Sequence, residues 1–387
     1  MEILNSLDQE DQAIHLAIAN NNSIIQYLLN RQSSNAIHGG SVQGCSFIHR
    51  DRENAHYRLF SDYFSENPVY NDAMFRRRYR MSRSLFLRII NAVEDYDNYF
   101  TQRRDTFGRL GLSSLQKGTA VFRMLAYGLP AEATDEYVKI GESTAIESMN
   151  RFCRAIVEIF SEQYLRSPTA NDVARLFYIG ENEVFQGYYD LWIWHAYFGM
   201  PGTNNDINVL ESSHLFSNLA QGIAPPAHYI IQGKDYNMGY YLADGIYPKW
   251  STIVQTIHEP RCPKKRYFAT KQEAYRKYVE RAFGVLQSRF AIVKRLARFW
   301  KKTVIHDIMT KCIILHNMII EDERDLNASI EAGREAPAPE VEIADDENTR
   351  FQEFLARYRE IKDRDAHFSL RNALINHLWE KYTNDSV

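Results

Sequence analysis

Three observations predict a mixed, helix-rich α/β fold. Several stretches repeat apolar residues at helical spacing, and the strongest, Ile305–Ile320, is apolar enough to require burial. Short aromatic and aliphatic runs stop at Gly, Pro or Asn, as strands do, at Leu191–Phe198 and again from Tyr240 onward. A chain of 387 residues is long enough to bury a sizeable core and to form two domains.

Composition narrows the class of protein. Hydrophobic residues make up 45% and aromatic residues 13% of the chain, as expected of a globular protein. The net charge of −3 excludes a generically basic nucleic-acid coat, so any DNA contact must come from local patches. The cysteines are too far apart for a Cys-x-x-Cys pair, which argues against a zinc knuckle or a disulfide framework and favours a reducing compartment. No run reads as a membrane span or a secretory leader, so an intracellular, soluble protein is expected.

Composition shifts suggest five segments. Residues 1–54 are polar and read as a flexible tail with one marginal helix at Asp8–Asn30. Residues 55–178 are helical, residues 186–322 mix strands with helices, residues 325–350 form an acidic linker, and residues 351–387 form a C-terminal helical segment.

The helical segment has the pattern of a small DNA-binding module. Ser82 can cap one helix, and Gly128-Leu129-Pro130 breaks a series of two or three helices within Ser113–Phe160. A helix–turn–helix is the natural interpretation, with Arg151 and Arg154 facing DNA. The alternative is a bundle that only packs on the following domain, with both arginines on plain surface.

Two acids stand out in the mixed segment. Asp244 follows the short strand that begins at Tyr240, and Gly245 and Pro248 then stop that strand. Glu280 lies on a predicted helix, with Arg276 one turn earlier as an i,i+4 partner. The helix is inferred from an apolar stripe made of Val279, Phe283, Leu286 and Phe290.

An acid at a strand end and an acid on a facing helix can converge on a divalent cation. Hard oxygen ligands suit Mg²⁺ or Mn²⁺, and phosphoryl-transfer nucleases use such clusters. The simpler alternative is a turn acid and a salt-bridged helix acid. Asp206 is a weaker candidate for a supporting role, because it is most simply a helix N-cap. The basic stretch Lys264, Lys265 and Arg266, predicted as a loop, suits a DNA strand entering the cleft, or is a solvated loop.

Four stretches closely resemble the transposase of plant PIF/Harbinger DNA transposons and host proteins derived from it. They read YYLADGIYPKW, RKYVERAFGVLQSRFAIV, DLWIWHAYFGMPGTNNDINVL and CIILHNMIIEDER, and they occur in family order between about Met74 and Tyr382. The resemblance implies a DDE nuclease with an RNase H-like fold that uses three acids and divalent metal to cut and join DNA. By position, Asp244 matches the second acid and Glu280 the third. It also implies a nuclear protein, with some present in the cytoplasm, that works with a separate Myb-like partner.

The first acid of the resembled family has no counterpart. It belongs to a Gly-Ser-Ile-Asp-Cys motif on the first strand, whereas here Phe185 runs directly into Gln186. A metal pair held by two carboxylates instead of three loses charge and geometry, so we expect weakened metal binding and impaired cleavage with DNA or protein binding retained. The alternative is an active nuclease, either with a substitute acid from Glu181, Glu183 or Asp190 or with the missing segment present in the transcript.

Overall fold

The computed structural model describes residues 48, 50–169, 172–173, 191–198, 205–222, 227–294, 302–323 and 347–384. Contacts divide the chain into Met1–His49 and Arg50–Val387, and every helix and strand described below belongs to the second unit. The predicted helix at Asp8–Asn30 lies outside the described residues, as does nearly all of the predicted acidic linker.

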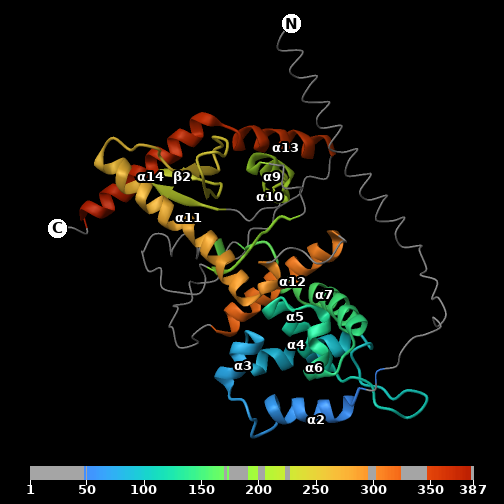
Figure 1. Cartoon of the computed structure of the whole chain (residues 1–387). Helices are drawn as coiled ribbons and strands as arrows, with labels where there is room; N and C mark the ends of the chain where they lie inside the picture. Colours follow the sequence, from blue (N-terminus) through green and yellow to red (C-terminus); the bar gives the residue numbers. More distant parts are fainter. Residues whose placement is uncertain are drawn as a thin grey trace. The chain divides into compact units, whose positions relative to one another are not determined.

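The first part of the described chain is a set of packed helices (Figure 1). They are α2 (Arg52–Tyr63), α3 (Asp72–Tyr79), α4 (Arg83–Tyr96), α5 (Ser114–Tyr127), the short η2 (Ala131–Thr134) and α6 (Asp135–Val138), and α7 (Glu142–Tyr164). These helices span Arg52 to Tyr164, so the first of them begins within the stretch predicted as tail.

Helix ends follow from local sequence. The Ser82 hydroxyl accepts a hydrogen bond from the Leu85 amide at 3.1 Å, which confirms the predicted cap of α4. Ser113 and Gln116 form a reciprocal capping box at the start of α5. Gly128 ends α5 with a φ of 62°, a left-handed conformation that glycine adopts without steric cost.

One hydrophobic core joins these helices to the later part of the chain. Phe86 of α4 and Phe122 of α5 are fully buried, with ring centroids 5.2 Å apart. The same core contains Leu286 and Phe290 from the end of α11 (Pro263–Arg289) and Ile313 from α12 (Lys302–Asp322). The upstream helices thus share a core with helices from the region predicted as a separate domain.

Helix α12 is the apolar helix that the sequence predicts to be buried. It packs mainly against α7, and Ile313, Ile314 and Leu315 are fully buried. By length and composition Thr303–Asp322 is also apolar enough to cross a membrane, but 67% of its most apolar window is buried within the protein. A core helix passes the same test, so we attach no membrane role to it.

The remaining described elements combine short strands with helices. They are α9 (Asp206–Ser212), α10 (His214–Ala220), β1 (Tyr229–Ile231), β2 (Lys234–Tyr236), β3 (Tyr241–Ala243), β4 (Ile253–Gln255), α11, η4 (Ala291–Val293), α13 (Glu347–Ile361) and α14 (Arg364–Asn384). Strands β1 and β2 pair antiparallel, and β3 and β4 pair parallel, as two separate two-stranded sheets. The helix-rich mixed class is confirmed.

The predicted strand at Leu191–Phe198 is wrong. Apart from one 3-10 residue at Leu191, the segment is extended and irregular, with no strand pairing among the described residues. The side chain of Asn317 on α12 takes the place of a neighbouring strand. Its Oδ1 accepts from the Ile193 amide at 3.0 Å and its Nδ2 donates to the Ile193 carbonyl at 2.9 Å. A side chain therefore satisfies backbone groups that a sheet would otherwise pair.

The C-terminal segment folds back onto the strands. Leu370, Leu374 and Ile375 of α14 share a small core with Tyr229 of β1 and Val254 of β4. Helix α14 also packs against α11, which it crosses in the view of Figure 1.

Candidate functional site

Asp244 lies where the sequence predicts, directly after a strand. Residues Tyr241, Leu242 and Ala243 pair in parallel register with β4, and Asp244 follows with its side chain about half exposed at 51%. A Cβ at Gly245 would lie 2.2 Å from Nε2 of His258, so a larger residue at this position would have to displace the imidazole. The chain thus leaves β3 in a tight turn with an imidazole against its backbone.

Gln272 fixes α11 against this strand end. It is 2% exposed, and its amide Nε2 donates to the carbonyl of Ala243 at 3.1 Å and to that of Val254 at 3.2 Å. Both sheet strands are therefore held to the helix one turn before Arg276. Sequence reasoning missed Gln272; the only available signal was a polar residue on the apolar face of a predicted helix.

Arg276 brings the two predicted acids together. Its Nη1 donates to Oε1 of Glu280 at 2.8 Å and lies 3.6 Å from Oδ2 of Asp244. The predicted i,i+4 pair is present, and the same guanidinium reaches the strand acid. Both carboxylates are largely solvent-exposed, so each contact stabilises the fold by no more than about 0.5–1 kcal/mol.

The helix carrying Glu280 differs in part from its predicted stripe. Leu286 and Phe290 are buried, but Val279 is 58% exposed. The buried line along α11 passes through Gln272, Ala282 and Leu286 instead. Glu280 consequently lies on an open face of the helix, beside the strand end.

Asp206 lies near this site but is not the N-cap of its helix. Asn205 caps α9, accepting from the Asn208 amide at 2.9 Å, and Asp206 is the first helical residue. Burial raises the pKa of the Tyr247 hydroxyl, and the negative charges of Asp206 and Asp244 raise it further. Both acids are thus close enough to Tyr247 to act on it electrostatically.

Two of the predicted metal ligands come together here, and no third joins them among the described residues. The described residues contain no cluster of three or more Asp, Glu, His or Cys side chains that could hold an ion. Asp244 and Glu280 share one guanidinium, which lies where a cation between them would lie. Mg²⁺ is commonly held by one or two carboxylates together with waters and substrate phosphates, so the shared guanidinium, rather than the number of carboxylates, opposes a cation here. The proposed substitutes Glu181, Glu183 and Asp190 lie outside the described residues.

The predicted basic contacts have different surroundings. Lys264, Lys265 and Arg266 are exposed, but they form the first turn of α11 rather than a loop, because Pro263 begins that helix. Three cations at a helix N-terminus are repelled by the positive end of the helix dipole, and an anion bound nearby would reduce this repulsion.

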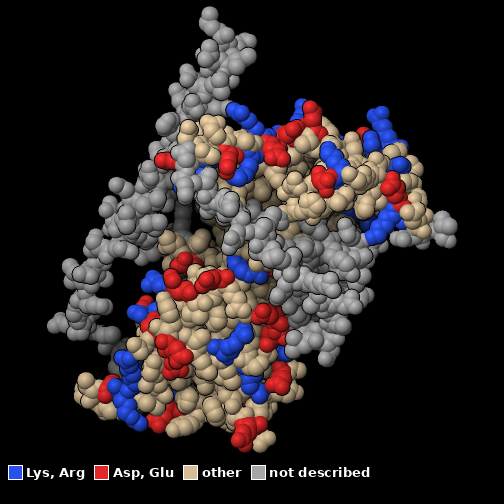
Figure 2. All heavy atoms as spheres, turned by 180° about the vertical axis from the view of Figure 1, so that it is seen from behind, with Lys and Arg blue, Asp and Glu red and all other residues tan. Residues whose placement is uncertain are grey.

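The two arginines of α7 also differ from each other. Arg151 pairs with Glu147 at 2.6 Å and with Asp97 at 3.2 Å. Arg154 is exposed and has no ion pair within the part of the chain that the structure describes. On the face shown in Figure 2, acidic and basic side chains are interspersed. Of the two, Arg154 is the better placed for an external anion.

Comparison with known proteins gives two family matches. Residues 186–327 match the family described as plant transposon protein, and the match begins at Gln186, directly after the predicted junction. Residues 56–94 match a domain of unknown function. No curated protein and no solved structure matches the chain. The family match supports a relation to plant transposases over the region that carries Asp244 and Glu280.

Proposed function

We propose that this protein derives from a PIF/Harbinger-type transposase and retains DNA or protein binding without competent metal-dependent cleavage. In this proposal residues 186–322 descend from an RNase H-like DDE nuclease whose first strand and first acid are absent. The helices before them serve as a DNA-binding module of the helix–turn–helix kind. The observation that carries the proposal is the Arg276 guanidinium shared by Asp244 and Glu280.

The strand environment supports the same interpretation. In an RNase H-like core, the segment Leu191–Phe198 would pair with the missing first strand. Here its backbone groups at Ile193 bond to the Asn317 side chain instead. A strand without its partner is expected to find such a substitute, because unpaired buried backbone groups cost about 1–3 kcal/mol each.

DNA is the proposed partner, through Arg154 and the Lys264–Arg266 turn. Mg²⁺ or Mn²⁺ would bind weakly, because only two carboxylates remain and an arginine neutralises part of their charge. A nuclear location and a Myb-like protein partner complete the proposal by resemblance to the family.

A second function is favoured by one specific observation. The fold does bring the strand acid and the helix acid to one place, as an active DDE nuclease requires. In that case a residue of the junction region replaces the missing first acid, and displacement of Arg276 opens the site.

One experiment separates these functions. Purified full-length protein is incubated with supercoiled plasmid in Mg²⁺ or Mn²⁺, and binding of a labelled duplex is measured on the same preparation. The proposed function predicts DNA binding with nicking no greater than that of Asp244→Asn. Nicking by the wild type that Asp244→Asn abolishes would establish the active nuclease. If the protein neither bound nor nicked DNA, DNA would be neither its partner nor its substrate.

A further inference from the structure

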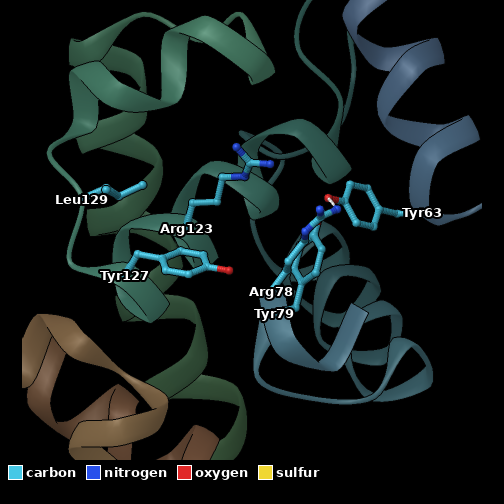
Figure 3. Close-up of a pocket in the computed structure, with 6 residues that line it drawn as sticks. All are labelled: Tyr63, Arg78, Tyr79, Arg123, Tyr127 and Leu129. Atoms are coloured by element: carbon cyan, nitrogen blue, oxygen red, sulfur yellow. Dashed lines mark hydrogen bonds between the residues drawn. The ribbon is translucent and has the colours of Figure 1, made fainter. Parts of the chain in front are cut away.

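A cationic pocket lies among α2, α3 and α5, and none of its lining residues is among the DNA contacts proposed above. Its volume is about 270 Å³, and it is lined by Tyr63, Arg78, Tyr79, Arg123, Tyr127 and Leu129. Figure 3 shows the Arg123 guanidinium and the Tyr127 hydroxyl on one side, facing Arg78, Tyr79 and Tyr63 on the other. The lining residues come from segments far apart in sequence, and α2, α3 and α5 also pack on one another.

The two pocket arginines have aromatic neighbours in place of carboxylates. Arg78 lies over the ring of Tyr70 at 3.8 Å and donates a hydrogen bond to the hydroxyl of Tyr63. Arg123 lies over the ring of Tyr137 at 4.4 Å. Neither forms an ion pair with a carboxylate in the described part of the chain.

A neighbouring acid bonds to one of these aromatic residues rather than to an arginine. Asp62 accepts a hydrogen bond from the hydroxyl of Tyr137, the ring that Arg123 covers. This contact raises the pKa of Tyr137, after the larger effect of burial. No ion pair joins Asp62 to Arg123, both of which the structure describes, so Asp62 acts on Tyr137 rather than on the guanidinium.

A third arginine is held at the edge of the pocket in a strained conformation. Arg80 ends α3 with a φ of 65°, in the left-handed region that non-glycine residues rarely adopt. Its guanidinium lies 5.4 Å from the ring centre of Tyr127, and its buried Nε has no hydrogen-bond partner among the described residues. Strain of this kind concentrates at ligand sites, where the surrounding structure enforces it.

Half-buried guanidinium groups without anions are energetically unfavourable. Ring faces compensate an arginine only in part, by about 0.5–2 kcal/mol. The planar donors of arginine match phosphate oxygens well, and tyrosine hydroxyls add neutral donors. The pocket is too large for a bare halide ion, and Tyr127 and Leu129 give it an apolar wall beside the charges.

We propose that this pocket binds the phosphate group of a phosphate ester. Arg78 and Arg123 donate to the phosphate oxygens, Tyr127 adds a hydroxyl, and the ester's organic part lies against the ring of Tyr127 and Leu129. Free phosphate, a mononucleotide and a nucleic-acid backbone share this chemistry. The inference does not depend on the proposed transposase ancestry or on loss of cleavage.

The test titrates the full-length protein separately with inorganic phosphate, deoxyadenosine 5′-monophosphate and a short DNA duplex. The variant is Arg123→Ala, and Arg123→Gln keeps the aliphatic stem over Tyr137 if the alanine variant fails to fold. Arg77→Ala is the matched control, because Arg77 lies on α3 beside Arg78 but is exposed and outside the pocket.

We expect at least one probe to bind and to lose at least about tenfold in affinity with Arg123→Ala or Arg123→Gln, because a charge-assisted hydrogen bond to the phosphate is lost. Arg77→Ala should change that affinity less than twofold. The tightest probe identifies the natural source of the phosphate. If no probe binds, or if the Arg77 and Arg123 variants lose affinity equally, the pocket is not a phosphate site.

Discussion

Replacement of Asn317 by leucine should destabilise the protein by about 3 kcal/mol. Leucine has nearly the same size, so the change opens no cavity and removes only the polar contacts. Asn317 is fully buried and forms hydrogen bonds of 2.8–3.0 Å with the Ile193 amide and with the carbonyls of Ile193 and Tyr164. A buried donor left unpaired costs about 1–3 kcal/mol, and two carbonyls that lose one donor each add a smaller amount.

The assay is urea unfolding followed by tryptophan fluorescence, because Trp192 and Trp194 flank the segment that Asn317 holds. Gln287→Leu is the matched control, since Gln287 is exposed on α11 and its replacement should change stability by less than about 0.5 kcal/mol. A loss below about 1 kcal/mol for Asn317→Leu would refute the idea that this side chain substitutes for a strand.

Three further predictions concern buried polar groups. Burial lowers the pKa of His316 from 6.5 to about 4, so the unfolded chain binds a proton in this window and the folded chain does not. Between pH 7 and pH 5, the unfolding free energy of the wild type should fall by about 2 kcal/mol more than that of His316→Gln. Equal pH profiles of the two proteins in urea unfolding would contradict this. Lys311 is fully buried, and its ammonium contacts the sulfur atoms of Met149 and Cys153 and lies over the ring of Phe152, with no ion pair among the described residues. Lys311→Met should therefore raise the unfolding free energy by about 1 kcal/mol, and a decrease of that size would show that the charge is needed. Gln272→Leu should speed amide hydrogen exchange in β3 and β4 and leave exchange in α4 unchanged. If exchange changed equally in all three elements, Gln272 would not be what holds the strands to α11.

Local chemistry made much of the fold predictable. Ser82 caps α4 and Gly128 ends α5 because hydroxyl capping and left-handed glycine need no distant partner. The position of Asp244 after a strand is also set locally, because Gly245 and Pro248 end the strand within a few residues. The i,i+4 contact of Arg276 is likewise set by helix geometry alone.

Tertiary context decided what the sequence pattern could not. Leu191–Phe198 has the composition of a strand, but a strand needs a neighbour, and Asn317 supplied its hydrogen bonds from a position far along the chain. Pro260 and Pro263 precede Lys264 and favour a loop by local composition. Pro263 is, however, well suited to the first turn of a helix, and α11 begins there. A contact distant in sequence decided the first case, and the place of proline in the first helical turn decided the second.

The pocket arginines show a second limit. Arg78 and Arg123 lie on different helices, and neither stands out in its own surroundings except for the basic run around Arg78. Only the packing of α3 on α5 brings them to one cavity. Sequence spacing carries no signal for such a site.

Mn²⁺ titration by calorimetry, on the wild type and on the Arg276→Gln, Asp244→Asn and double variants, measures how far Arg276 weakens metal binding by Asp244 and Glu280. Two exposed ion pairs of about 0.5 kcal/mol each imply that removal of the guanidinium tightens Mn²⁺ binding about fivefold. We predict wild-type binding weaker than about 1 mM, a gain in Arg276→Gln, and loss of that gain when Asp244→Asn is added. Micromolar binding of two ions by the wild type, abolished by Asp244→Asn alone, would show instead that the metal centre of an active nuclease is intact.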